Sequence, residues 1–277
     1  MSGIIEVENL SFSYAPLSTV LKNISFEVMS GTFLAVAGPN GAGKSTLLNL
    51  LCGMLVPKSG TIRIDAVAIE SYKTDDLAKK VAVVRQESVP VFGFSVIEMV
   101  LMARTPHFGQ LGFESKADRE IANEALEATD TAQFALRPLG SLSSGERQRV
   151  FIARALAQNT AILLLDEPTS FLDLKHQVGI YDLLKATQLE KGKTIVAVTH
   201  DINLAAQYAD EVLLLGADSS YNIGKIEDIL FPEQIEKVFG IRTFAGSVGQ
   251  EKFFLPLGKL AKDSRQINSK PNSSQQK

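Results

Sequence analysis

A glycine-rich turn between an apolar run and an expected helix is the feature that most constrains how this chain can fold. Residues 38–46 read Gly-Pro-Asn-Gly-Ala-Gly-Lys-Ser-Thr and match the pattern G-x-x-x-x-G-K-[ST]. Residues 32–37, just before the turn, are almost continuously apolar and predict a buried strand. A helix is expected from Lys44 to about Gly53. A strand that leads through such a turn into a helix favours an α/β fold.

The chemistry of phosphate binding explains the residue types in this turn. Gly41 and Gly43 let the backbone bend so that consecutive N–H groups point at phosphate oxygens. The helix adds the positive end of its dipole, the Lys44 ammonium reaches the β- and γ-phosphates, and the Ser45 hydroxyl is placed to bind Mg²⁺. We therefore predict a phosphate-binding loop, rather than a chance glycine-rich turn, formed by Gly38, Pro39, Asn40, Gly41, Ala42, Gly43, Lys44, Ser45 and Thr46.

A second apolar run, residues 161–165, ends in two acids, Asp166 and Glu167. Carboxylates at the C-terminal ends of strands lie where open α/β sheets bind ligands. We expect Asp166 to hold Mg²⁺ through water and Glu167 to accept a proton from an attacking water. By itself, Asp-Glu-Pro could equally be the polar start of a loop; the phosphate-binding loop favours the functional interpretation.

Composition excludes some classes of function. The net charge of −3 gives no overall basic field that would draw the chain to nucleic acid. A single cysteine, Cys52, cannot form an internal disulfide, which fits a reducing compartment. The first residues do not form a signal peptide, and no apolar run approaches the roughly 20 residues that span a bilayer. A role at a membrane would therefore require the spanning part of another chain.

The apolar pattern divides the chain into regions. Strands are expected at 4–8, 24–28, 62–64, 81–85, 161–165, 194–198 and 212–215, and helices after Gly145 and at 174–190 and 202–208. This alternation predicts a mostly parallel sheet with helices on its faces. Residues 87–142 form a predicted helical insertion, with a capping box at Ser95–Glu98 and another helix opened by Ser115 with Asp118. A short strand is proposed at 253–255, within a domain covering 1–258, and residues 259–277 are expected to be a disordered polar tail.

Further motifs occur in a fixed order along the chain. Residues 142–146 read Leu-Ser-Ser-Gly-Glu, Gln86 follows the strand at 81–85, residues 170–173 read Ser-Phe-Leu-Asp, and His200 stands in Thr-His-Asp. Together with Tyr14 they resemble, in family order, the motifs of the ATP-binding-cassette (ABC) ATPases, and the resemblance covers about residues 4–240. It implies a P-loop NTPase cassette, in which a RecA-like, mostly parallel sheet core carries an antiparallel β part and a helical insertion.

Each of these motifs has a blander alternative when taken alone. Ser143 with Glu146 is also an ordinary capping box, and a lone glutamine such as Gln86 is usually solvated. His200 could simply begin a helix, and Tyr14 could be a core residue. Their shared order and spacing favour the family interpretation.

The resemblance implies a mechanism in which two cassettes face each other head to tail. ATP on the phosphate loop of one copy is covered by the signature of the other, so a C2 homodimer is expected. Glu167 would deprotonate water, His200 would contact the γ-phosphate, and Gln86 would touch Mg²⁺ or water. Tyr14 would stack on adenine. The remaining nucleotide contacts would come from Ser143, Ser144, Gly145, Glu146 and Asp173.

Three residues depart from the family pattern. Ser144 replaces a frequent glycine and adds a hydroxyl donor, and Glu146 replaces a frequent glutamine while keeping an acceptor. We expect little loss of function from either change, because both suit a helix N-terminus near phosphate. Phe171 is bulkier than the small residue common at its position, so the coupling of its loop is expected to differ.

The helical insertion suggests what is transported. Residues 96–109 resemble the insertion of importers for iron-siderophores, haem and cobalamin, although an amphipathic helix that stops at Pro106 would explain the pattern without a partner. The expected partners are integral membrane permease subunits and, indirectly, an extracytoplasmic substrate-binding protein, with the chain on the cytoplasmic face of the membrane. Molybdate or other metal uptake, a soluble cassette ATPase acting on DNA or ribosomes, and a different P-loop enzyme such as a kinase are the alternatives.

Overall fold

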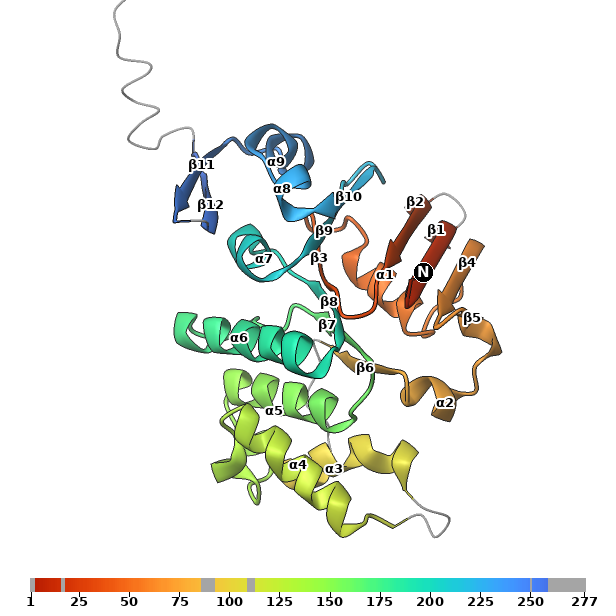
Figure 1. Cartoon of the computed structure of the whole chain (residues 1–277), viewed down its shortest axis with the longest axis vertical. Coiled ribbons are helices and arrows are strands. Elements are labelled where there is room, and N and C mark those ends of the chain that lie inside the picture. The colour runs from red at the N-terminus through yellow and green to blue at the C-terminus, as the bar shows by residue number, and fades with distance from the viewer. Residues whose placement is uncertain (1–2, 16–17, 86–92, 109–112, 250, 259–277) are drawn as a thin grey trace, which may run out of the picture.

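The computed structural model describes residues 3–15, 18–85, 93–108, 113–249 and 251–258 (Figure 1). Its central sheet consists of β3 (Phe33–Ala37), β6 (Val81–Val84), β7 (Ile162–Asp166), β8 (Thr194–Val198), β9 (Glu211–Leu215) and β10 (Tyr221–Lys225). The strand order is β10-β9-β3-β8-β7-β6; the five strands from β9 to β6 are parallel, and β10 is antiparallel to β9. The predicted α/β fold with a mostly parallel sheet is confirmed.

Helices cover this sheet, which explains its apolar strands. Every residue of β3 and β8 is buried, as expected for strands packed on both faces. The principal helices in contact with the sheet are α1 (Lys44–Leu51), α5 (Ser144–Ala157), α6 (Leu174–Lys191) and α7 (Ile202–Tyr208). Successive residues of β3 contribute to different apolar clusters, which places the strand at the centre of the core.

A four-stranded antiparallel sheet packs beside α1 (Figure 1). Residues of this sheet, of α1 and of the central strands form one apolar cluster. The antiparallel sheet consists of β1 (Ile5–Ala15), β2 (Ser18–Val28), β4 (Ser59–Ile64) and β5 (Val67–Ala68), in the order β2-β1-β4-β5. The first two strands are longer than the sequence pattern predicted, because their alternation continues through register shifts along the β1–β2 pair. Tyr14 lies near the end of β1.

The helical insertion separates β6 from β7 in sequence although these strands are paired in the sheet. Its helices are α3 (Val96–Leu101) and α4 (Lys116–Ala128), preceded by the short α2 (Thr74–Ala78) before β6. The predicted capping box at Ser95 is present, and the predicted helix start at Ser115 also forms a capping box, with Asp118. The described chain also has 3₁₀ turns at Ile69–Ser71, Met102–His107, Ala132–Phe134 and Leu139–Ser141. Parts of the predicted insertion, residues 87–92 and 109–112, lie outside the described residues.

The C-terminal part packs on the edge of the core near α7 (Figure 1). It consists of α8 (Ile226–Ile229), α9 (Pro232–Phe239) and a hairpin of β11 (Thr243–Val248) with β12 (Glu251–Pro256). The strand proposed at 253–255 is therefore confirmed, and Phe254 is its buried residue. The tail predicted to be disordered, 259–277, lies outside the described residues. Among the helices that are described, none is both long and apolar enough to cross a bilayer.

Candidate functional site

The glycine-rich turn joins β3 to α1 and carries a buried lysine. Lys44 is the first residue of α1, and its ammonium donates hydrogen bonds to the carbonyl oxygens of Gly38 (2.8 Å) and Pro39 (2.9 Å). Burial lowers the pKa of Lys44, while the nearby carboxylates of Glu167 and Asp166 oppose that shift. A partly desolvated cation beside a helix N-terminus is suited to bind an anion.

Two glycines in this turn adopt backbone conformations that other residues rarely adopt. Gly41 has φ of +83° and Gly43, the residue that caps α1, has φ of +94°. A Cβ atom at Gly43 would also lie only 2.7 Å from the Leu21 side chain. The bend that the sequence motif predicted is therefore present directly before α1.

The acidic end of β7 lies next to the start of α1. The Ser45 hydroxyl donates a hydrogen bond of 3.1 Å to Asp166 Oδ1. Burial is the main cause that raises the pKa of Asp166, and the Ser45 hydrogen bond partly counteracts it. A hydroxyl and a carboxylate oxygen that meet here are the hard oxygen ligands that Mg²⁺ prefers.

Glu167 follows Asp166 in a left-handed backbone conformation, with φ of +48°. Its N–H donates to the Val198 carbonyl (3.1 Å), and its Oε2 accepts a hydrogen bond of 3.0 Å from Ser170. Non-glycine residues rarely occupy this region, and such strain tends to cluster at functional sites. The chain therefore leaves the strand direction at Glu167, and the hydrogen bond from Ser170 orients its carboxylate.

His200 approaches Glu167 from the neighbouring strand. It lies two residues after the end of β8. Thr199, the residue between them, donates its N–H to the Val36 carbonyl. Nδ1 of His200 lies 3.8 Å from Glu167 Oε2, and the His200 side chain is 65% exposed. Because β3, β8 and β7 are adjacent in the sheet, their C-terminal ends bring Lys44, His200 and Glu167 to one edge.

Lys44 and Glu167 line an open pocket of about 420 Å³, within the range of small-molecule sites, whereas His200 lines a separate neighbouring cavity. Tyr14 forms one wall; it is 65% exposed, its hydroxyl lies 3.1 Å from Thr46 Oγ1, and its ring meets Phe12 edge-on. An exposed aromatic ring at the pocket is available for stacking, so Tyr14 is not a core residue. The lining residues are Tyr14, Val20, Asn40, Gly41, Gly43, Lys44, Ser45, Thr46 and Glu167.

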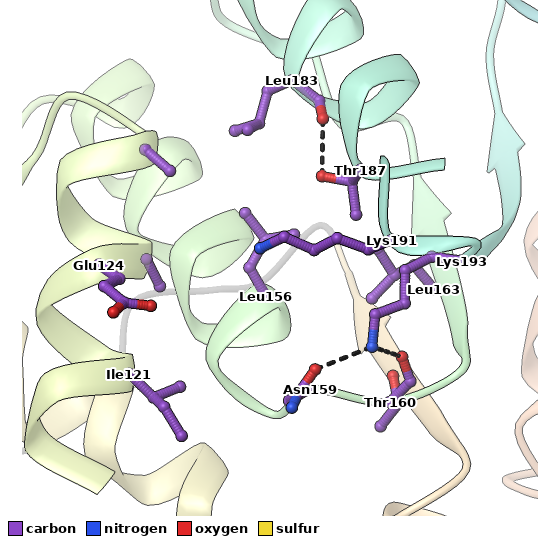
Figure 2. Close-up of a pocket in the computed structure, with 12 residues that line it drawn as sticks. Ile121, Glu124, Leu156, Asn159, Thr160, Leu163, Leu183, Thr187, Lys191 and Lys193 are labelled. Carbon is purple, nitrogen blue, oxygen red and sulfur yellow. Dashed lines mark hydrogen bonds between the residues drawn. The ribbon is translucent and has the colours of Figure 1, made fainter. Parts of the chain in front are cut away.

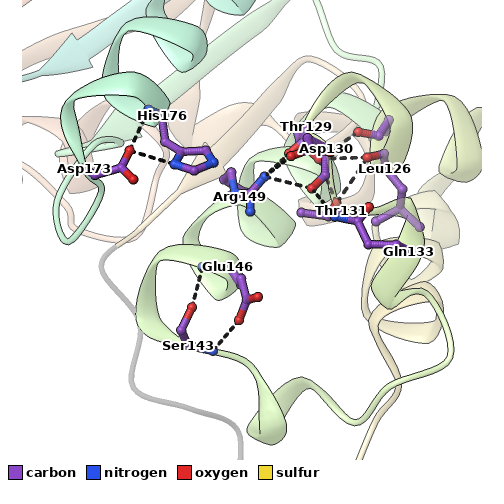
Figure 3. Close-up of polar contacts among 11 residues, drawn as sticks. Leu126, Thr129, Asp130, Thr131, Gln133, Ser143, Glu146, Arg149, Asp173 and His176 are labelled. Carbon is purple, nitrogen blue, oxygen red and sulfur yellow. Dashed lines mark hydrogen bonds and ion pairs between the residues drawn. The ribbon is translucent and has the colours of Figure 1, made fainter.

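The signature segment lies at the N-terminus of α5. Ser143 caps the helix, its Oγ accepting from the Glu146 N–H (3.3 Å), while Glu146 Oε2 accepts from the Ser143 N–H (2.7 Å) (Figure 3). These hydrogen bonds lower the pKa of Glu146, the bond from the Ser143 backbone having the largest effect. The helix begins two residues earlier than predicted, at Ser144, so the N–H groups of Ser144 and Gly145 belong to its unpaired first turn.

The loop before α6 closes the other side of this segment. Asp173 caps α6 by accepting from the His176 N–H (2.9 Å), and His176 Nδ1 lies 2.7 Å from the same carboxylate oxygen (Figure 3). Phe171 has φ of +67° and a side chain that is 70% exposed. A second pocket, of about 370 Å³, is formed here by Ser143, Ser144, Gly145, Glu146, Arg149, Phe171, Leu172, Asp173 and His176.

The structure divides most of the predicted site residues between two pockets, while His200 lines a third cavity. Among the described residues, none lines both the phosphate-loop pocket and the signature pocket. Asp173 belongs to the signature pocket, and Ala42 is a buried core residue that can offer only its backbone. Gln86 lies outside the described residues. Val20 and Arg149 line the pockets, and Ser170 orients Glu167. Val20 belongs to no sequence motif, whereas Ser170 and Arg149 lie in or just after the motifs at 170–173 and 142–146 but were assigned no task there.

A smaller cavity, of about 150 Å³, lies between α4, the end of α5 and α6 (Figure 2). There Lys193 Nζ donates a hydrogen bond of 2.8 Å to Asn159 Oδ1, and Lys191 faces Glu124 from across the cavity (Figure 2). The cavity contains no residue of the phosphate loop, the signature or the acidic strand end, and its volume is below the usual range for ligand sites. We therefore assign the site to the phosphate loop.

Comparison with known proteins agrees with this geometry. The family model described as ABC transporter matches residues 21–170. The hemin import ATP-binding protein of Gloeobacter violaceus is 42% identical over 231 residues, covering 81% of this chain and 83% of that protein. The ferric enterobactin transport ATP-binding protein of Escherichia coli is 36% identical over 256 residues, covering 92% and 94% of the two chains.

Solved structures show the same fold. An ABC transporter assigned to the metal-chelate type, in an inward-facing conformation, superposes with a TM-score of 0.80 at 33% identity, covering 94% of this chain and 99% of that chain. The dimeric bacterial ABC transporter cassette MJ0796 superposes with a TM-score of 0.72 at 32% identity, covering 80% and 98%. The chain belongs to the ABC transporter family and is one of its nucleotide-binding ATPases.

Proposed function

We propose that this chain is the ATP-hydrolysing subunit of an ABC importer for an iron complex, such as a siderophore or haem, or for a cobalamin-like substrate. The observation that carries the catalytic part is the meeting of Lys44, Glu167 and His200 at one sheet edge, beside a pocket with an exposed tyrosine. The transport part is supported by the relatives, which are named for the import of hemin and of ferric enterobactin.

Each group at the sheet edge has a proposed task in hydrolysis. The backbone of the loop from Gly38 to Thr46 and the Lys44 ammonium hold the phosphates, and Tyr14 stacks on adenine. Glu167 orients a water and accepts its proton, a task for which its hydrogen bond from Ser170 holds the carboxylate in place. His200 contacts the γ-phosphate from the adjacent strand. General-base catalysis of this kind contributes about 10²–10⁴ in rate.

Mg²⁺ is proposed to accompany ATP. Ser45 and Asp166 fit this ion, because their oxygens already approach each other within 3.1 Å at the phosphate loop. Gln86 is proposed to complete the contacts to the ion or to water. When bound, Mg²⁺ neutralises part of the phosphate charge.

The signature pocket is proposed to act in trans. Because it is separate from the phosphate-loop pocket, a C2 homodimer in which each signature covers the partner's nucleotide would use both. Ser143, Ser144 and Gly145 would then present donors to the γ-phosphate of the other copy, with Glu146 and Asp173 holding their helix ends. The dimeric form of the related cassette supports this arrangement.

Mixing two inactive variants tests the dimer directly. Lys44→Ala disables the phosphate loop, and Ser144→Arg blocks the signature, so each variant alone should hydrolyse little ATP. A heterodimer of the two contains one intact site, and an equal mixture should therefore regain about a quarter of the wild-type rate per chain. A mixture as inactive as its components, in which mass spectrometry detects the heterodimer, would contradict the trans arrangement.

Co-purification tests the transport role. We expect the chain to bind an integral membrane permease at the cytoplasmic face of the membrane, and through it an extracytoplasmic substrate-binding protein, with no nucleic acid involved. Capture of ribosomes or DNA in place of a membrane protein would instead favour a soluble cassette ATPase. Uptake assays that compare iron complexes, cobalamin and molybdate would then separate the candidate substrates.

A further inference from the structure

We propose that Asn203 is a positioning residue through which the C-terminal β11–β12 hairpin holds His200 in place. The inference concerns how the chain fixes this histidine, and its functional consequence rests on the role proposed above for His200 at the γ-phosphate. The His200 side chain is 65% exposed. Surrounding side chains therefore do not enclose the imidazole, and its position depends on the segment that carries it.

That segment is anchored at both ends by hydrogen bonds. On the sheet side, the Thr199 N–H donates to the Val36 carbonyl (3.0 Å). On the helix side, Asp201 caps α7, its Oδ1 accepting from the N–H groups of Asn203 (2.8 Å) and Leu204 (3.0 Å). The direction of His200 is thus set jointly by β8, which is fixed in the central sheet, and by the first turn of α7.

The first turn of α7 is in turn attached to the hairpin. Asn203 Oδ1 accepts a hydrogen bond of 2.7 Å from the Phe254 N–H, and Asn203 Nδ2 donates one of 3.3 Å to the Phe254 carbonyl. One carboxamide therefore pairs both backbone groups of a residue 51 positions further along the chain. Only asparagine or glutamine offers a donor and an acceptor in this fixed geometry.

Phe254 gives this contact a rigid base. Its side chain is 3% exposed and belongs to the apolar cluster that contains Ala35 and Ala37 of β3 and Ala205 of α7. The same strand, β3, leads directly into the phosphate loop. The hairpin therefore connects the helix after His200 to the strand before Lys44, independently of β8.

The packing between the start of α7 and the C-terminal elements is incomplete on the side of His200. A cavity of about 300 Å³ lies there, with His200 and Ile202 on one side and Phe239 and Pro256 on the other. Ile202 packs against the apolar cluster that contains Phe254, and the Asn203–Phe254 pair adds the polar part of the connection at this point. Loss of the pair should release the first turn of α7 without opening the core.

Variants at Asn203 test the connection. Asn203→Leu removes both hydrogen bonds, whereas Asn203→Asp keeps the acceptor for the shorter one. We expect Asn203→Leu to lower kcat by about tenfold or more while the KM for ATP changes by less than about twofold, since misplacement alone can have such effects. Asn203→Asp should recover part of the loss. Phe244→Ala is the matched control, because Phe244 lies on the same hairpin with its side chain 57% exposed; its kcat should be unchanged.

Imidazole NMR signals provide a readout that does not depend on hydrolysis. The chain has only three histidines, and the His200 signal is assigned by its disappearance in His200→Ala. Asn203→Leu should shift or broaden this signal and leave those of His107 and His176 unchanged. An unchanged His200 signal overturns the inference. A displaced signal with full turnover instead shows that His200 is positioned as inferred but lacks the proposed catalytic role. Should Asn203→Leu fail to fold, Asn203→Asp is judged by the same two measurements.

Discussion

The phosphate-loop pocket and the signature pocket differ in how completely one chain builds them. In the first, Lys44 is buried and bonded to two carbonyls of its own loop, and Ser45 already meets Asp166. In the second, Ser143 and Ser144 are exposed, and Phe171 projects 70% of its side chain into solvent. Both pockets contain side chains that pair within the chain and one exposed aromatic residue. They differ in that the first gathers groups from the ends of β1, β3 and β7, whereas the second is formed by the exposed start of α5 and the loop before α6. The exposed helix start supports the proposal that the second surface is completed by another molecule.

The largest loss of ATP hydrolysis is expected from a change in the phosphate-loop pocket, which one chain builds by itself. Lys44→Ala removes the cation held beside the helix N-terminus, and loss of one such electrostatic group costs about 10²–10³ in rate. ATP binding, followed with a fluorescent analogue, and phosphate release should both fall. Lys58→Ala, at an exposed lysine outside the pocket, serves as the control. Normal ATP binding by Lys44→Ala would place the phosphates elsewhere.

Glu167→Gln should separate binding from hydrolysis on the same side. The amide preserves the size of the side chain but cannot accept a proton, so hydrolysis should slow by at least about tenfold while ATP still binds. Because ATP then persists, size-exclusion chromatography with ATP should show more dimer than the wild type. Near-normal turnover would remove Glu167 from the role of general base.

Asp166→Asn should have opposite effects on activity and stability. Burial raises the pKa of Asp166 above its unfolded value, so the charged carboxylate lowers the folded-state stability at neutral pH. This penalty is fully present above the folded pKa and disappears as the pH falls toward the unfolded value. Without nucleotide, Asp166→Asn should melt a few degrees higher than wild type at pH 7, and the gain should vanish on acidification. Mg²⁺-dependent hydrolysis should fall. A lower melting temperature at pH 7 would contradict the assignment of burial as the dominant cause.

The smallest change in the stability of the isolated chain is expected from a substitution in the signature pocket. Phe171→Gly relieves a left-handed conformation but adds freedom to the unfolded chain, so the free energy of unfolding should change by less than about 1 kcal/mol. ATP-driven dimerisation should nevertheless weaken, because an exposed apolar side chain is lost from the proposed contact. Leu136→Ala removes another exposed apolar side chain, outside this pocket, and should leave dimerisation unchanged. Equal dimerisation of Phe171→Gly and wild type would show that Phe171 lies outside the contact.

Much of the architecture could be predicted from local patterns. Strand β8 and helix α7 have the predicted bounds, because apolar runs and helix caps are properties of short segments. Strand β10 was not predicted, because its residues are only partly buried and form no apolar run. Helix α9 was missed although Pro232 at its start and Gly240 after its end are ordinary helix signals. The strand at 253–255 was predicted, but its pairing with β11 and its contact with Asn203 depend on residues distant in sequence.

By itself, the sequence determined the identity of the phosphate-binding loop, the acidic strand end and the capped signature helix, because each depends on residues within a few positions of one another. Only the tertiary structure decided that His200 lies 3.8 Å from Glu167, and that Phe254 holds the helix following His200. It also decided that the signature forms a pocket separate from the phosphate loop. The reason is physical: strand order in a parallel sheet is set by the burial of whole faces, which no local pattern encodes.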